Sequence, residues 1–275
     1  MPEQPETGKA RTPTRIRHEI RVRTLDVLEV RRLTPSMIRV TLGGSQLEGF
    51  TSLGFDDHIK MFFPDPGDNV PRLPIVGPQG LEMPEGQARP VARDYTVRAH
   101  DAERRRLDID FAVHESGPAT AWAITVRPGD KAWIAGPRGS FVFPLAFDWH
   151  LLVGDETALP AISRRIEELP SGTKAVAVIE VAGKESELPL ATSADIRIVW
   201  AHCEGAQPGS PEPLAKALAE VEWLEGDFHV WLGCGSGVAR QLRQWLIDER
   251  GANPKWLRAS GYWRHGESGY HDHYD

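Results

Sequence analysis

The spacing of hydrophobic residues changes once along the chain, near residue 146, and this change restricts the fold more than any other feature. From His18 to about Phe143, apolar residues fall in short alternating runs separated by Gly and Pro. Closely spaced short strands of this kind favour an antiparallel barrel. Beyond residue 146, short apolar runs alternate with segments of helical periodicity, which predicts a doubly wound parallel sheet. The predicted fold class is therefore a β-barrel followed by an α/β domain.

This pattern divides the chain into four predicted regions: a flexible tail over residues 1–17, a β-barrel domain over 18–145, an α/β domain over 146–266 and a polar tail over 267–275. The predicted barrel elements are strands at Glu19–Val30, Met37–Gly43, His58–Phe63, Arg93–Ala99, Arg106–Val113 and Asp130–Ile134, a long loop at Pro64–Pro90 and a helix at Ala119–Ile124. The predicted α/β elements are strands at 150–154, 174–182, 195–200, 227–232 and Leu257–Trp263, with helices at 157–169, Pro211–Val221 and from the glycine turn at 233–237 to Arg250.

Composition excludes several classes of protein. The longest apolar runs are far shorter than the roughly 20 residues that cross a bilayer, and the first residues lack an apolar leader, so we expect a soluble, cytoplasmic protein. A net charge of −7, from 32 basic and 39 acidic residues, disfavours nucleic-acid binding. Cys203 and Cys234 are too few for a disulfide framework or a four-thiolate cluster. Redox chemistry would therefore use an organic cofactor or an imported metal.

Two segments of the barrel domain have residues suited to a dinucleotide. In RDYTVR, Arg93 and Tyr95 point to one face of a strand and Thr96 to the other, which offers a guanidinium for phosphate and a ring for stacking. Such residues are also common on ordinary barrel strands. In HESGPATAW, the turn at Gly117 starts a helix whose free amides, with Thr120, would form a cup for a pyrophosphate. The alternative is a plain loop-to-helix turn.

Two further segments lie at strand ends of the α/β domain. GDETALPAI (154–162) is a strand-to-helix turn where acidic side chains disfavour phosphate and favour an adenine or ribose contact. GCGSG (233–237) would let a cofactor approach the backbone closely. Cys234 at that helix start is either a nucleophile or part of a plain glycine turn.

Isolated residues leave alternatives open. Lys60 is either a snorkelling lysine or a cation that attracts an anionic substrate. His265, His271 and His273 indicate a solvated tail rather than a metal site, and Trp263 indicates a core or interface position. We predict no metal ligands.

The order of these segments resembles the siderophore-interacting protein family, the FAD-dependent ferric-siderophore reductases of the ferredoxin reductase-like superfamily. The resemblance runs from about His18 to Gly266 and is carried by DHIKMFFP, RDYTVR, DFAVHESGPATAWA, GPRGSF, GDETALPAISRRIEELP and GYWRHG. The chain departs from the family at Gly233–Gly235, where an acidic turn is usual and where this version is closer to ferredoxin reductases.

The resemblance implies roles for individual residues. Tyr95 would pack on the flavin, Thr96 would hydrogen-bond near its N5/O4 edge, and Arg93 would neutralise FAD phosphate; Tyr95 and Thr96 are the implied catalytic residues. Lys60 and Arg264 would make the cleft basic for an anionic ferric chelate. The other implied cofactor-binding residues are Val97, Asp110, His114, Gly117, Pro118, Ala119, Thr120, Asp155, Thr157, Ala158, Gly233, Cys234 and Gly235.

The resemblance also implies the reaction: NADH or NADPH passes a hydride to FAD, and reduced FAD passes single electrons to Fe(III) in a siderophore, releasing Fe(II). Two alternatives remain, a general flavin or ferredoxin-type reductase with another acceptor and a non-enzymatic siderophore-binding protein. Glu180 would favour NADH by accepting from a ribose hydroxyl, whereas Lys184 would favour NADPH. The siderophore class and the oligomeric state are left open. No nucleic acid and no stable membrane association are expected.

Overall fold

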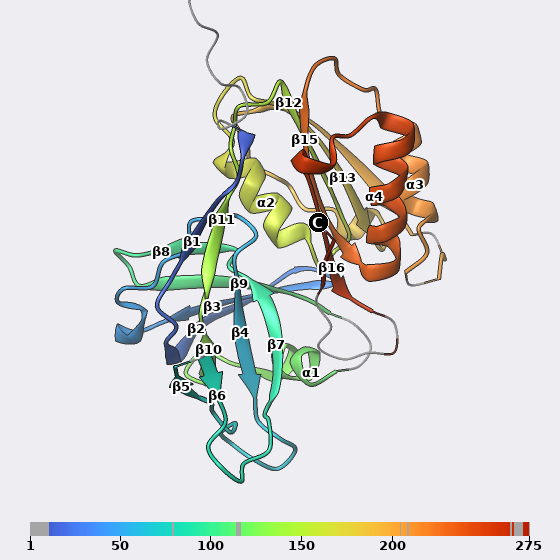
Figure 1. Cartoon of the computed structure of the whole chain (residues 1–275). Helices are drawn as coiled ribbons and strands as arrows, with labels where there is room; N and C mark the ends of the chain where they lie inside the picture. The colour runs from blue at the N-terminus through green and yellow to red at the C-terminus, as the bar shows by residue number, and fades with distance from the viewer. Residues whose placement is uncertain are drawn as a thin grey trace, which may run out of the picture. The chain divides into compact units, whose positions relative to one another are not determined.

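The computed structural model describes residues 11–78, 80–113, 117–203, 205–207, 209–264, 266 and 272–274. Their contacts form two compact units. The N-terminal unit is Arg15–Phe141, and the C-terminal unit is Val142–Asp275 together with the chain up to Thr14. Figure 1 shows the elements of both units.

A seven-stranded antiparallel sheet forms most of the N-terminal unit, in the order β7-β4-β10-β2-β3-β9-β8. Its core consists of inward-facing residues at alternating positions along the strands, such as Leu25, Val40, Ile59 and Ile109, all of which are fully buried. The strands and helix of this unit are β1 (Thr14–Arg17), β2 (Val22–Thr34), β3 (Met37–Gly43), β4 (His58–Phe63), β5 (Ile75–Gly77), β6 (Gly80–Glu82), β7 (Val91–Thr96), β8 (Ala99–Asp101), β9 (Arg106–Ala112), α1 (Pro118–Thr125), β10 (Lys131–Ala135) and β11 (Gly139–Val142).

Three predictions for this part of the chain need correction. Residues 14–17 are not a tail but strand β1, which pairs with β11; its polar side chains concealed a pairing made by backbone groups. The predicted loop at 64–90 contains the hairpin β5–β6. The strand predicted to run to Ala99 ends at Thr96, because the next two amides bond outside the ladder, to the carbonyl oxygens of Asp57 and Asp108.

Six strands form the sheet of the C-terminal unit, in the order β14-β13-β12-β15-β16-β17. The first five are parallel, and β17 is antiparallel. The elements are β12 (Trp149–Gly154), α2 (Leu159–Glu168), β13 (Lys174–Val181), β14 (Asp195–His202), α3 (Glu212–Ala219), β15 (Phe228–Gly235), α4 (Ser236–Arg250), β16 (Leu257–Trp263) and β17 (Asp272–Tyr274), with short 3-10 turns at Lys184–Ser186 and Pro254–Trp256. A further 3-10 turn at Ser45–Leu47 belongs to the N-terminal unit.

Helices cover both faces of this sheet. Apolar residues of α3 and α4 share one core with Leu151 and Val153 of β12, and α2 lies on the other side of the sheet (Figure 1). The predicted class, an antiparallel β unit followed by a doubly wound α/β unit, is confirmed. Among the described residues, none of the helices has both the length and the hydropathy to cross a bilayer.

The predicted glycine turn at 233–237 is wrong. Gly233, Cys234 and Gly235 are the last residues of strand β15, and α4 begins directly after them. The glycines are needed for close packing: a Cβ on Gly233 would lie 2.7 Å from the Trp231 ring, and one on Gly235 would lie 3.0 Å from the Trp263 ring. The predicted C-terminal tail also differs, since Asp272–Tyr274 pairs with β16.

Arg11 precedes the N-terminal unit in the sequence but contacts the C-terminal unit. Its Nε donates to the carbonyl oxygen of Ala146 at 2.7 Å, its Nη1 pairs with Asp227, and its guanidinium lies 4.9 Å from the ring centre of Trp256. The first described residues are therefore held by charge and ring contacts to the second half of the chain.

Candidate functional site

The RDYTVR segment places its three motif residues on β7. Strand register sets Arg93 opposite Met61 and Tyr95 opposite Ile59, so both face the side that holds the core. The Tyr95 ring packs against Phe111, with centroids 4.3 Å apart, and burial raises the pKa of the Tyr95 hydroxyl well above its usual value. Tyr95 is therefore a neutral aromatic wall rather than an acid–base group.

Thr96 and Val97, which follow Tyr95, differ in what their polar groups contact. Thr96 is 7% exposed, and its hydroxyl makes no hydrogen bond within the described part of the chain. The oxygen is not among the fully buried unpaired side-chain atoms, so it reaches the surface and is available to a ligand. Val97 is fully buried, and its amide donates to the Asp57 carbonyl at 2.8 Å. The Val97 side chain therefore packs in the core of the N-terminal unit.

Helix α1 begins as an uncapped N-terminus. Gly117 has φ +144°, which strongly favours glycine, and Pro118 is the first helical residue. Among the described residues, which do not include 114–116, no side chain caps the helix, and its first turn has no acidic residue. The amides of Ala119 and Thr120 therefore form an electropositive end. His114, predicted to belong to this cup, lies outside the described residues.

Aromatic contacts fix α1 against the sheet. Trp122 of α1 contacts Phe111 and Phe63, with centroid distances of 5.5 and 5.8 Å, and Phe111 in turn contacts Tyr95. This chain of rings connects the helix start to the motif strand β7.

Asp110, which the resemblance assigns to the cofactor, is paired with arginines inside the N-terminal unit. Its Oδ1 accepts from Arg39 Nε at 2.6 Å, its Oδ2 accepts from Arg39 Nη2 at 2.8 Å, and Arg98 Nε lies 3.8 Å away. The side chain is 2% exposed. Because protein donors occupy both oxygens, Asp110 balances buried arginines.

Lys60 lies on the opposite face of the sheet from Arg93 and Tyr95, as the register with β7 requires. Its Nζ pairs with Asp94 at 2.6 Å, and its side chain is 41% exposed. The ammonium group is therefore accessible but partly neutralised. Arg264, predicted to act with it, belongs to the C-terminal unit.

Asp155 connects three segments of the C-terminal unit. Its Oδ2 accepts from the Gly235 amide at 3.0 Å and from the Trp263 indole at 2.8 Å, while its Oδ1 accepts from the Thr157 amide and hydroxyl. Ala158 is fully buried, and Thr157 is half-buried. The residues predicted to contact adenosine thus hold the sheet edge together within the protein.

A pocket of about 300 Å³ lies at the start of α4. The helix has no side-chain cap, so its first amides present partial positive charge. Of the predicted residues, Gly235 and Arg264 line this pocket. Gly233 and Cys234 do not, and Cys234 is 1% exposed. Burial raises the pKa of its thiol well above the usual value, which argues against a nucleophile. Ser236 and Gly237, from the predicted GCGSG segment, also line it, and the lining residues missed from the sequence are Gly209, Val238, Arg240 and Trp263.

Glu180 is a half-buried carboxyl at the end of β13. It accepts from the Cys203 thiol at 3.4 Å. Burial, and then the charge of Asp155, raises the pKa of Glu180 to about 7. Burial, followed by the charge of Glu180, raises the pKa of Cys203 to about 12. Glu180 therefore exists as a mixture of protonated and ionised forms near neutral pH.

Within the described ranges, no group of three or more His, Cys, Asp or Glu is placed to hold a metal ion. His265 and His271 lie outside those ranges, and only the backbone of His273 is described.

Comparisons with known families match both halves of the chain. The Siderophore-interacting FAD-binding domain matches residues 26–141, and the Siderophore-interacting protein family matches residues 147–266. The NADPH-dependent ferric-chelate reductase of Escherichia coli is 38% identical over 258 residues, covering 92% of this chain and 97% of the relative.

Two further proteins are similar over nearly the whole chain. The ferric vibriobactin reductase of Vibrio cholerae is 31% identical over 256 residues, with 91% of this chain and 93% of the relative covered. The crystal structure of a siderophore utilization protein from T. fusca aligns with a TM-score of 0.87 at 40% identity, covering 95% of this chain and 99% of that one.

Proposed function

The chain belongs to the siderophore-interacting protein family, and from this membership we propose that it is an NAD(P)H-dependent, FAD-containing reductase of ferric siderophores. The observation that carries this proposal is the E. coli ferric-chelate reductase, which is similar along 97% of its length. When bound, FAD supplies the chemistry: it accepts a hydride from NAD(P)H and returns electrons one at a time to Fe(III).

Features of the N-terminal unit fit FAD. The Tyr95 ring offers a flat apolar surface for an isoalloxazine, and the Thr96 hydroxyl has no hydrogen-bond partner among the described residues. The uncapped start of α1 suits a pyrophosphate, since its amides point outward beside a glycine of positive φ. Arg93 would add a guanidinium for phosphate, and His114 remains part of the proposed set.

The pocket at the start of α4 is the proposed site for the nicotinamide donor. It combines the amide end of a 15-residue helix with two arginines and the Trp263 ring, a set that suits a phosphate and a flat ring. Asp155 holds Trp263 in place through its indole N–H.

The proposed substrate is an anionic ferric chelate, with iron brought in by the siderophore and not held by protein ligands. Lys60 is proposed to attract it. The cytoplasm is the proposed compartment, because both cysteines are free and thiols persist in reducing surroundings.

The test is the visible spectrum of the purified protein under anaerobic conditions. Oxidised-flavin absorption should bleach with NADH or NADPH and return when a ferric siderophore is added, as Fe(II) forms. Bleaching without return would retain a reductase and assign another acceptor. A colourless protein that takes up no added FAD, yet binds the chelate, would overturn the enzyme and leave a siderophore-binding protein.

Arg93→Ala should weaken FAD retention about tenfold, because it removes a charge-assisted contact to phosphate. The measurement is the flavin-to-protein ratio after dialysis. Arg89→Ala, at an exposed arginine of the same unit, is the matched control. Undiminished flavin in Arg93→Ala would exclude the phosphate role.

Lys60→Ala should raise the KM for ferric chelate about threefold or more, while flavin reduction by NAD(P)H is unchanged. Asp94→Asn removes the carboxylate that pairs with Lys60, so it should lower that KM instead. Steady-state and half-reaction kinetics separate these effects. Equal losses in both half-reactions would show a folding or flavin defect and remove Lys60 from the substrate site.

A further inference from the structure

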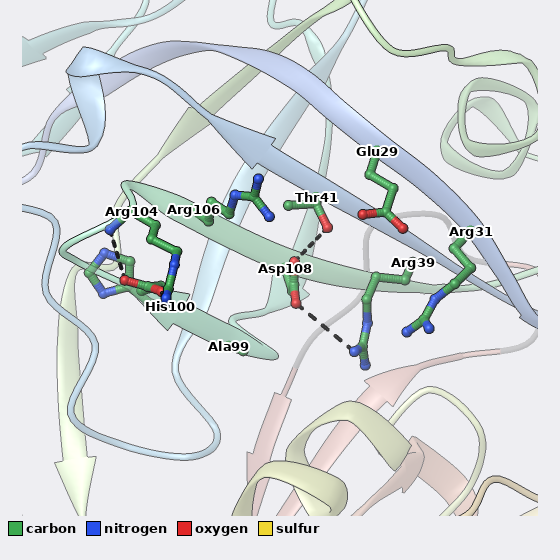
Figure 2. Close-up of a pocket in the computed structure, with 10 residues that line it drawn as sticks. Glu29, Arg31, Arg39, Thr41, Ala99, His100, Arg104, Arg106 and Asp108 are labelled. Carbon is green, nitrogen blue, oxygen red and sulfur yellow. Dashed lines mark hydrogen bonds and ion pairs between the residues drawn. The ribbon is translucent and has the colours of Figure 1, made fainter.

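A second cavity lies on the outer face of the N-terminal sheet, across strands β2, β3, β9 and β8. It has a volume of about 510 Å³, within the range of small-molecule sites. None of the residues predicted for flavin, donor or chelate lines it. Figure 2 shows its side chains. We call it the arginine groove, defined by Glu29, Arg31, Arg39, Thr41, Ala99, His100, Asp101, Arg104, Arg106 and Asp108.

The strand register brings like charges together in this groove. Arg31 of β2 lies directly opposite Arg39 of β3, and like charges placed this way repel each other. Asp110 and Asp108 balance Arg39, so Arg31 is the cation added at this end. Arg106 of β9 lies opposite Gly43, four residues along β3 from Arg39, or about 13 Å at strand rise. Figure 2 shows Arg31 beside Arg39 at one end of the groove and Arg106 beside Arg104 at the other.

Two of the three acidic residues in the groove are already engaged. Asp108 accepts from the Thr41 hydroxyl at 2.7 Å and lies 4.0 Å from Arg39. Asp101 pairs with Arg104 at 2.8 Å. Within the described part of the chain, the guanidinium groups of Arg31 and Arg106 make no ion pair, and both residues are exposed. The third acidic residue, Glu29, lies on β2 together with Arg31, and its negative charge would repel an anion bound in the groove.

We propose that the arginine groove binds a small polyanion with phosphate or carboxylate groups at both ends. A guanidinium matches these planar or trigonal oxygen groups through paired N–H donors. Arg31 would hold one end and Arg106 the other, and Glu29 would limit the affinity. This site does not depend on the proposed flavin chemistry.

The test is calorimetric titration of the FAD-saturated full-length protein with two probes, inorganic tripolyphosphate and citrate, at low salt. Arg31→Ala and Arg106→Ala should each weaken binding about tenfold, and the double variant more. Glu29→Gln should strengthen binding about threefold, a gain that a folding defect cannot produce. Arg127→Ala, at an exposed arginine outside the groove, should change nothing. The tighter of the two probes identifies phosphate or carboxylate as the natural group.

The polyanion should also raise the melting temperature of the wild type but not of the double variant. Wild-type affinity in the double variant, or absence of binding by both probes at millimolar concentration, would overturn the proposal. Displacement of FAD by tripolyphosphate would overturn it too, because it would assign the groove to the cofactor.

Discussion

Asp110→Asn is expected to lower the free energy of unfolding of the N-terminal unit by about 3 kcal/mol or more. The carboxylate receives two hydrogen bonds from Arg39 and lies near Arg98, and all three side chains are largely buried. Asparagine fills the same space but removes the charge and turns an N–H₂ group toward a guanidinium. Arg39 and Arg98 would then lose the carboxylate that they share, and Asp108 lies farther from Arg39, at 4.0 Å.

Urea unfolding of the apo protein measures this effect, with Asp26→Asn as the matched control. Asp26 pairs with Lys131, and both side chains are about half exposed, so the control should cost about 1 kcal/mol or less. A wild-type unfolding midpoint for Asp110→Asn combined with loss of flavin would restore the cofactor role that the sequence predicts.

The C-terminal unit is expected to lose stability as the pH falls below about 6.5, because two adjacent histidines are buried in the neutral form. His150 and His229 are register partners on β12 and β15, 0% and 3% exposed. Burial, and then the charge of Arg165, lowers the pKa of His150 to about 3, and burial lowers the pKa of His229 well below its usual value. Arg258 adds a further repulsive charge at His229.

The direction follows from proton binding. Because the folded pKa values lie below the unfolded ones, the unfolded chain binds more protons below pH 6.5, and stability falls with pH. The expected loss is about 2 kcal/mol per histidine between pH 7 and pH 5. Glu180 acts in the opposite direction, because its raised pKa lets the folded unit bind a proton over the same range, and it offsets about 2 kcal/mol of the summed loss. Stability should be level above about pH 8.

Urea midpoints of the wild type and of His150→Leu/His229→Leu across this range provide the measurement. The double variant should no longer lose stability as the pH falls from 7 to 5, because only the opposing effect of Glu180 remains, whatever its absolute stability. His58→Gln, at an exposed histidine of the N-terminal unit, should retain the wild-type slope. An unchanged slope in the double variant would place the titrating groups elsewhere.

The fold could be predicted from the sequence because the apolar residues that become buried recur at the regular spacing of strands and helices. Met37–Gly43, His58–Phe63 and Leu257–Trp263 were predicted with the bounds that the structure has, since each combines alternating or continuous apolar residues with clear turn residues. β1 could not be predicted, because backbone hydrogen bonds to β11 hold it, and these leave no pattern in its side chains.

The candidate site was less predictable than the fold, because the sequence around a charged residue does not indicate which distant residue pairs with it. Asp110 and Asp155 are residues of a type that often contacts a cofactor. In the structure, however, arginine, backbone amide and indole N–H groups donate to their carboxylate oxygens. Those donors come from residues 71, 80 and 108 positions away. Arg240 was missed although it lies on the first turns of a helix that follows a buried strand, a position that could have indicated an anion site.

The contacts of Arg11 have a consequence for the order of synthesis. Its partner Asp227 is translated 216 residues later, after the whole of Arg15–Phe141 has left the ribosome. The N-terminal unit can therefore form on the nascent chain while the segment that carries Arg11 still waits for its binding surface. That segment docks only when the α/β half is nearly complete. A purification tag fused before Arg11 would thus affect the folding of the C-terminal unit, although the tag is attached at the end of the chain that is synthesised first.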